Sequence, residues 1–213
     1  MARQQVVTVG PLAAANATLI CASQIPQAGT PLTLSGQPDV ARRVLVTYGS
    51  EAAARTLTIS GTNVFGNPIR ETLAIPSGAG GTIATQQDFA SVTQVLDGGV
   101  TWTAAITVGT NAVGSSPWMG LNKEFGQVQY SIAVFVNGTV SGTIEYTYDD
   151  PNNSMGTGPA VARPIAAQAP LAAITANADA TLNNVAYAWR LTLNSGSGSA
   201  QATCIQAGIT NLG

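Results

Sequence analysis

Apolar and polar residues alternate along much of the chain. In residues 101–108 (TWTAAITV), Trp102 and Ile106 lie on one side of the alternation, and the other side is mostly threonine. A two-residue period is that of a β-strand with one buried face. The same alternation occurs in residues 55–60, 70–75 and 186–194. No segment carries a 3.6-residue apolar stripe between helix caps, so the sequence predicts an all-β fold with little helix.

Asn137 and Gly138 form the strongest turn signal in the sequence. They separate two alternating runs, residues 127–136 and 139–150. An Asn-Gly dipeptide favours a two-residue hairpin loop because both turn positions need positive φ, so we expect the two runs to pair with each other. A second hairpin is expected where residues 189–194 turn through residues 195–199 into residues 200–206.

Residues 111–126 separate two predicted domains, because this stretch is rich in Gly, Asn and Ser and lacks alternation. We expect β-sandwich or jelly-roll-like domains, with hairpins and long loops, over residues 1–110 and 127–213. Within the second, residues 151–184 form a long connection that is poor in charge and rich in alanine and proline. A long loop in a compact domain usually makes contacts, so we expect this one to lie against a neighbouring subunit. The interface candidates are Trp118, Pro151, Pro164 and Pro170.

Charged residues are scarce in this sequence. Only 8% of its 213 residues are charged, about a third of the usual share. Low surface charge favours association, so we expect a homo-oligomer or a surface covered by a partner. The net charge is −2, and Lys123 is the single lysine. Without a basic patch to neutralise phosphates, direct nucleic-acid binding is not expected.

The N-terminal residues and the apolar runs bear on localisation. The sequence MARQQVVTVG has no long apolar core, and no uninterrupted apolar run approaches membrane-spanning length. We therefore expect no signal peptide and no transmembrane segment, with synthesis in the cytoplasm.

Catalysis has little support in the sequence. The chain has no histidine, which is the commonest general base and the commonest metal ligand. There is no G-x-S-x-G motif, and a serine nucleophile would need Lys123 as its base. We expect neither an enzyme nor a cofactor.

Asp149 and Asp150 end a predicted strand and precede Pro151. Proline cannot continue a central ladder, and Asp and Asn initiate turns, so a strand-end turn is the favoured interpretation. A calcium site is the alternative, since hard oxygen ligands are what calcium binds, although the spacing differs from that of an EF-hand. The candidate ligands are Asp149, Asp150, Asn152 and Asn153.

The two cysteines, Cys21 and Cys204, lie far apart in strand-like runs and form no CxxC motif. They are interpreted as small buried hydrophobic residues, or as a disulfide that forms outside the reducing cytoplasm. Trp102, Tyr187 and Trp189 lie on the bulky faces of alternating runs, which favours the core.

Two passages of the sequence carry residue patterns that resemble those of known protein modules. Residues 43–95 contain T-x-T-x-x-G-T-x-x-x-G-N-x-x-x-E-T, then a glycine-rich loop and F-x-x-V-T. The matching residues are Thr56, Thr58, Gly61, Thr62, Gly66, Asn67, Glu71, Thr72, Phe89, Val92 and Thr93. This passage resembles a β-domain common in bacteriophage virion proteins. Pro68 departs from the small or polar residue of that pattern and stiffens the turn.

Residues 142–151 and 175–208 form the second passage, with a tyrosine-rich strand ending in Asp-Asp and a closing R-L-x-x-x-x-G-x-G segment. It is similar to another phage particle module. Together the resemblances imply a structural component of a tailed-phage particle, and they carry over no active-site residue.

Low charge and a long apolar connection suit a subunit that is stabilised by burial in a symmetric assembly. We expect a capsid decoration or cement protein, located in the virion, that stabilises the head by bridging subunits of the major capsid protein or other virion proteins. A head-to-tail connector or tail component is the alternative within the particle. A receptor- or carbohydrate-binding module, dependent on calcium through Asp149 and Asp150, is the alternative of a different class.

Overall fold

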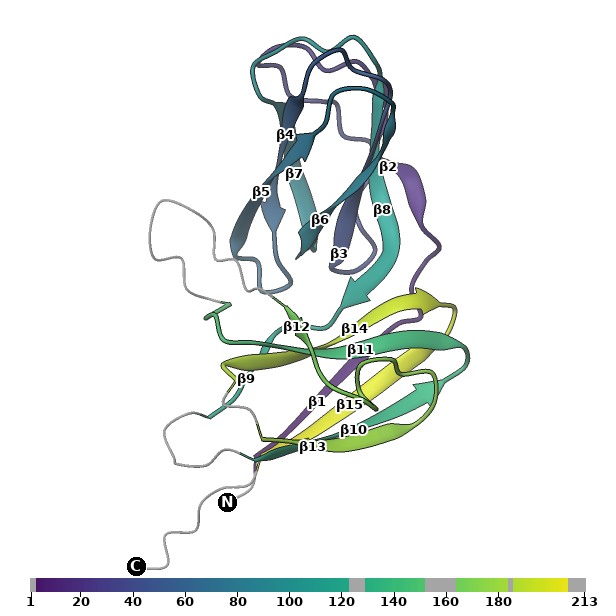
Figure 1. Ribbon diagram of the computed structural model, residues 1–213, viewed down its shortest axis with the longest axis vertical. Helices are drawn as coiled ribbons and strands as arrows, with labels where there is room; N and C mark the ends of the chain where they lie inside the picture. The colour runs from purple at the N-terminus through teal and green to yellow at the C-terminus, as the bar shows by residue number, and fades with distance from the viewer. Residues whose placement is uncertain (1–2, 123–128, 152–163, 184–185, 207–213) are drawn as a thin grey trace, which may run out of the picture. The chain divides into compact units, whose positions relative to one another are not determined.

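The computed structural model describes residues 3–122, 129–151, 164–183 and 186–206 (Figure 1). All the regular secondary structure within these ranges is β-strand, and most of the strand pairs run antiparallel. The described residues fold as two compact units. Unit 1 contains residues 3–12 and those from Val113 onward, and unit 2 contains Ala13–Ala112. The predicted all-β fold is confirmed.

Unit 1 has two sheets around one core, which Figure 1 shows as two layers. Its first sheet, sheet A, has the order β1 (Arg3–Val9), β15 (Ser199–Gln206), β10 (Tyr130–Asn137) and β13 (Ala178–Leu182). The second has the order β12 (Ile165–Ala166), β11 (Val140–Thr147) and β14 (Ala188–Gly196), with β9 (Met119–Gly120) and the end of β8 (Ile106–Ser115) also pairing with β14. Ile132, Ile144, Trp189 and Cys204 lie in the core between them.

The two predicted hairpins of this region are wrong. Strand β10 pairs with β13 and β15, whereas β11 pairs with β12 and β14. Strands β14 and β15 likewise belong to different sheets. Each connection is therefore an arch that carries the chain from one sheet to the other. The alternation specifies which face of a strand is buried but not its partner, and crossing between sheets lets the apolar faces of consecutive strands cover each other.

Glycines let the two arches pack against each other. The Gly198 N–H donates to the Thr139 carbonyl at 2.9 Å, which joins the β14–β15 arch to the β10–β11 arch. Gly196 has φ +110°, and a Cβ there would lie 2.3 Å from the Thr139 carbonyl oxygen. A Cβ on Gly198 would lie 2.4 Å from the Asn137 carbonyl oxygen. Only glycine permits this approach of backbone to backbone.

Unit 2 also has two layers of strands. One is a three-stranded sheet of β5 (Pro68–Ile75), β4 (Arg55–Thr62) and β7 (Ser91–Asp97). The other contains β2 (Asn16–Gln24), β3 (Arg42–Tyr48), β6 (Gly81–Phe89) and the first part of β8. Ile20, Val46, Leu57 and Phe89 are fully buried in its core. Here β4 and β5 form a true hairpin, with Thr62 opposite Pro68.

The structure groups two segments differently from the predicted division at residues 111–126. Strand β1 pairs along its length with β15, so residues 3–12 belong with the C-terminal residues of the chain. Strand β8 runs through residues 111–115 instead of ending before them, and it passes from unit 2 into unit 1. A seven-residue strand near the N-terminus carries no signal of its partner, because the pairing residues lie about two hundred positions away. Whether the units fold independently stays a prediction.

Candidate functional site

The acidic turn at Asp149 and Asp150 is built into unit 1 by hydrogen bonds. The Tyr187 hydroxyl donates to Asp150 Oδ2 at 2.6 Å, and the Asp149 N–H donates to Thr147 Oγ1 at 3.1 Å. The hydrogen bond with Asp150 raises the pKa of Tyr187, with a smaller contribution from burial. These contacts link the end of β11 to the residues before β14, as is expected of a strand-end turn.

The calcium hypothesis stays a prediction. Asn152 and Asn153 lie outside the described residues. Within the described ranges, no cluster of three or more His, Cys, Asp or Glu side chains could hold a metal ion. Asp149 and Asp150 are the two carboxylates that the sequence offers there, and one of them already accepts a hydrogen bond from Tyr187.

Trp118 lies half-buried against unit 1. The Arg190 guanidinium carbon lies 4.4 Å from the centre of the Trp118 ring, which is a cation–π arrangement. Arg190 Nε also donates to Glu145 Oε2 at 2.7 Å, and Thr192 Oγ1 donates to the same oxygen at 2.8 Å. Sequence reasoning missed this group because Glu145 and Arg190 lie far apart in the chain and become neighbours only through the register of β11 and β14.

The three prolines predicted to lie at an interface differ in their exposure. Pro151 and Pro164 are half-buried and Pro170 is exposed. However, the described part of residues 151–184 packs largely on its own unit: Leu171 and Ile174 are fully buried in the core, and β13 pairs with β10. Although the sequence shows no strand pattern in this segment, the segment forms part of sheet A and contributes side chains to the core of unit 1.

Cys21 and Cys204 lie in separate cores, Cys21 in unit 2 and Cys204 in unit 1. Both are buried, and burial raises the pKa of the Cys21 thiol to about 11. Positions inside separate cores favour the interpretation of both residues as buried hydrophobic side chains. The disulfide stays a prediction.

The outward face of sheet A is the best candidate for an interaction surface, and the sequence analysis did not identify it. Register places Val6, Thr203, Ala133 and Asp179 side by side across the four strands. The face consists of Gln4, Val6, Thr8, Ser131, Ala133, Phe135, Asp179, Thr181, Gln201, Thr203 and Ile205. Asp179 is the one charged residue in this set.

Three large apolar side chains are exposed on this face. Val6 is 47% exposed, Ile205 48% and Phe135 59%. Small or uncharged polar residues surround them, so a partner could cover the face without burying unpaired charge. The alternation of β1, β10 and β15 could have revealed the set, because these apolar residues occupy positions where the pattern predicts solvent.

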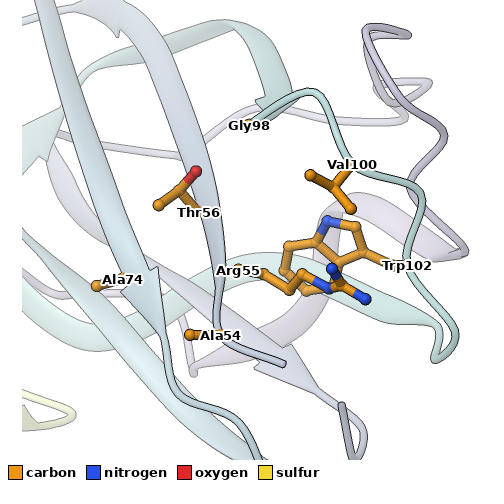
Figure 2. Close-up of a pocket in the computed structure, with 7 residues that line it drawn as sticks. All are labelled: Ala54, Arg55, Thr56, Ala74, Gly98, Val100 and Trp102. Carbon is orange, nitrogen blue, oxygen red and sulfur yellow. The ribbon is translucent and has the colours of Figure 1, made fainter. Parts of the chain in front are cut away.

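A small pocket lies in unit 2, at the end of the β4–β5 hairpin away from its turn (Figure 2). Its volume is about 210 Å³, below the usual range for sites that bind drug-sized ligands. Thr56 and Ala74 line it from the two strands, and Val100 and Trp102 from the segment after β7. The remaining lining residues are Ala54, Arg55 and Gly98.

Glu51 supports one wall of this pocket from within unit 2. Its carboxylate accepts the Thr103 and Ala104 N–H groups at 2.9 and 2.7 Å, the Thr103 hydroxyl at 3.1 Å and Arg55 Nε at 3.2 Å. Burial acts to raise the pKa of Glu51, but these hydrogen bonds outweigh it and hold the pKa below the ordinary value of 4.5. Glu51 thus fixes Arg55 and the chain beyond Trp102.

Asp97 supports the segment that carries Gly98 and Val100. Its carboxylate accepts the Val100 N–H at 2.6 Å and the Gly29 N–H at 2.9 Å. The Gly98 N–H donates to the Thr56 carbonyl at 3.0 Å, and a Cβ on Gly98 would lie 2.0 Å from Thr56 Oγ1. The pocket is therefore preformed, with one hydroxyl and one guanidinium among mostly apolar atoms, and it suits a small apolar group.

The described residues form no helix that could span a membrane.

The chain matches no protein-family model and no curated protein. Among solved structures it is similar to the PBSX exported protein XepA, at 9% sequence identity over 97% of this chain and 86% of that chain, with a TM-score of 0.24. A likeness at this TM-score carries no argument about function, so the function has to be inferred from the residues of this chain.

Proposed function

We propose that this chain is a structural protein of a tailed-bacteriophage particle, acting on the head as a decoration protein that bridges capsid subunits. The observation that carries this proposal is the outward face of sheet A, which has three exposed apolar side chains and one charge. The assignment to a phage particle is supported by the resemblance of residues 43–95, and of residues 142–151 with 175–208, to virion-protein patterns. The scarcity of charge over the whole chain supports extensive contact with other proteins.

The mechanism of such a protein is burial of surface. Val6, Phe135 and Ile205 lie on paired, regular strands, so little conformational entropy is lost when a partner covers them. Each apolar Å² removed from water contributes about 25 cal/mol. A modest contact repeated by many copies over a symmetric shell therefore sums to a large resistance against opening of the shell.

The test is to mix the purified protein with empty shells and to count its copies by position using electron cryo-microscopy. Decoration predicts copies at the symmetry positions of the shell, with sheet A facing the capsid. A ring of roughly a dozen copies or fewer on the tail axis would contradict decoration and support the connector or tail alternative.

A variant tests the face itself. Phe135→Glu places a charge at the most exposed apolar residue of sheet A and should reduce the number of bound copies at least tenfold. Val40→Glu, at an exposed apolar residue of unit 2, is the matched control and should bind as the wild type does. Equal binding by Phe135→Glu would overturn the assignment of this face.

A further inference from the structure

The turn of the β4–β5 hairpin exposes two neighbouring apolar side chains. Val64 is 45% exposed and Phe65 is 52% exposed. We call residues 63–67 the tip. The tip carries no charge, and it ends a hairpin whose strands pair over their full length. A partner can cover these two side chains without burying an unpaired charge.

Hydrogen bonds hold the tip in one conformation. Asn63 Oδ1 accepts the Phe65 N–H at 2.9 Å and the Asn67 N–H at 3.0 Å. The Asn63 N–H donates to the Asn67 carbonyl at 2.9 Å, and Gly66 adopts φ +78°. A partner that binds Phe65 therefore does not have to order the loop first, which lowers the entropic cost of binding.

The pocket described above lies at the other end of the same hairpin. Thr56 and Ala74, which face each other in the register, line the pocket, whereas Thr62 and Pro68 adjoin the tip. Six residues of extended chain separate the two ends, a distance of roughly 20 Å. A tip cannot reach the pocket of its own hairpin, so a tip that enters such a pocket must come from another copy.

We propose that the tip of one copy inserts Phe65 into the pocket of a second copy. The pocket is preformed, and Ala54, Ala74, Val100 and Trp102 give it a mostly apolar lining. Its one charged group, Arg55, already pairs with Glu51, so an uncharged tip can enter without leaving that charge unpaired. The Arg55 guanidinium can also lie against an inserted aromatic ring.

Because the tip and the pocket are different surfaces, this contact is heterologous. Each copy can offer a tip to one neighbour and a pocket to another, so the contact generates rings or open chains of copies. The proposal needs only this protein, and it stands or fails independently of binding to a capsid through sheet A.

Sedimentation of the purified protein tests the proposal. We expect the wild type to associate as concentration rises, and Phe65→Ser to weaken association roughly 30-fold or more. Two variants that obstruct the pocket at exposed residues, Ala74→Glu and Val100→Glu, should weaken it similarly. Val40→Ser is the control for loss of an exposed apolar side chain and should associate as the wild type does.

Mixing distinguishes this contact from any symmetric one. Phe65→Ser retains a pocket and Ala74→Glu retains a tip, so an equimolar mixture should form a dimer and nothing larger. A wild type that stays monomeric up to about 1 mM would overturn the proposal. Association of Phe65→Ser at wild-type strength, or failure of the mixture to form the dimer, would overturn it as well.

Discussion

The turns at residues 63–67 and at Asn137 and Gly138 look alike in sequence, yet they connect strands in different ways. Each places asparagine and glycine between two alternating runs. In unit 2 the turn closes the β4–β5 hairpin, and Asn63 binds the backbone of its own loop. In unit 1 the turn carries the chain from sheet A to the opposite sheet, and the Thr139 carbonyl accepts a hydrogen bond from Gly198 of the other arch.

The difference shows that the turn residues determine where the chain reverses but not which strands pair. Residues 63–67 are stabilised by contacts within the loop, so the hairpin is specified locally. The β10–β11 arch is stabilised by a second arch some sixty residues later in the chain. Its geometry is therefore a property of the assembled sandwich.

Replacing Gly196 by alanine should have the largest effect on this comparison. The new methyl group would overlap the Thr139 carbonyl, and the backbone has φ +110°. We expect the free energy of unfolding to fall by about 3 kcal/mol, measured by urea denaturation. Gly66→Ala is the matched control, because Gly66 has φ +78° but nothing within 4 Å of a Cβ, and it should cost about 1 kcal/mol. Equal losses would contradict the packed-arch interpretation.

Replacing Glu51 by glutamine tests the electrostatic support of unit 2. Four hydrogen bonds to a buried carboxylate are weakened, so we expect a loss of about 2 kcal/mol at neutral pH. The folded-state pKa of Glu51 lies below 4.5, so its contribution is present above that pH and disappears as the pH falls through the folded-state pKa. The difference in urea stability between variant and wild type should therefore shrink in acid. A constant difference would exclude ionised Glu51 as the cause.

Replacing Asn63 by alanine should have a smaller effect, about 1 kcal/mol, because two loop N–H groups lose their acceptor. Asn137→Ala is the comparison in unit 1. Asn137 is exposed, and the arch depends on backbone contacts, so its replacement should change stability by less than about 0.5 kcal/mol. The same denaturation assay measures both. A larger loss for Asn137→Ala would mean that the arch also depends on its asparagine side chain.

Replacing Asp150 by asparagine should have the smallest effect on stability and a clear effect on titration. Without the carboxylate beside its hydroxyl, the pKa of Tyr187 should fall toward its ordinary value, which ultraviolet difference titration detects. Asp179→Asn, on sheet A, should leave the titration unchanged. A calcium-dependent rise in melting temperature that Asp150→Asn abolishes would instead support the calcium hypothesis.

Local pattern predicted the strand content and the identity of many core residues. Trp189 is 0% exposed in β14, as predicted. Trp102 is also buried, at 2% exposure, but it lies in an irregular segment, because the strand expected over residues 101–108 begins only at Ile106. Tyr187 is only half-buried, and its hydroxyl binds Asp150. The candidate surface was not predicted. It arises because β1 and β15, from opposite ends of the chain, pair beside β10, and no local signal encodes a pairing over that distance.

The sequence by itself determined the all-β class and the buried face of several strands, and it contains no histidine. These are properties of single residues and of two-residue periodicity, which depend only on near neighbours. The tertiary structure decided which strands pair, that the two arches pack together, that sheet A presents Val6, Phe135 and Ile205 on one face, and that the tip and the pocket lie at opposite ends of one hairpin. Those outcomes follow from burial of apolar faces against each other, which the chain achieves only as a whole.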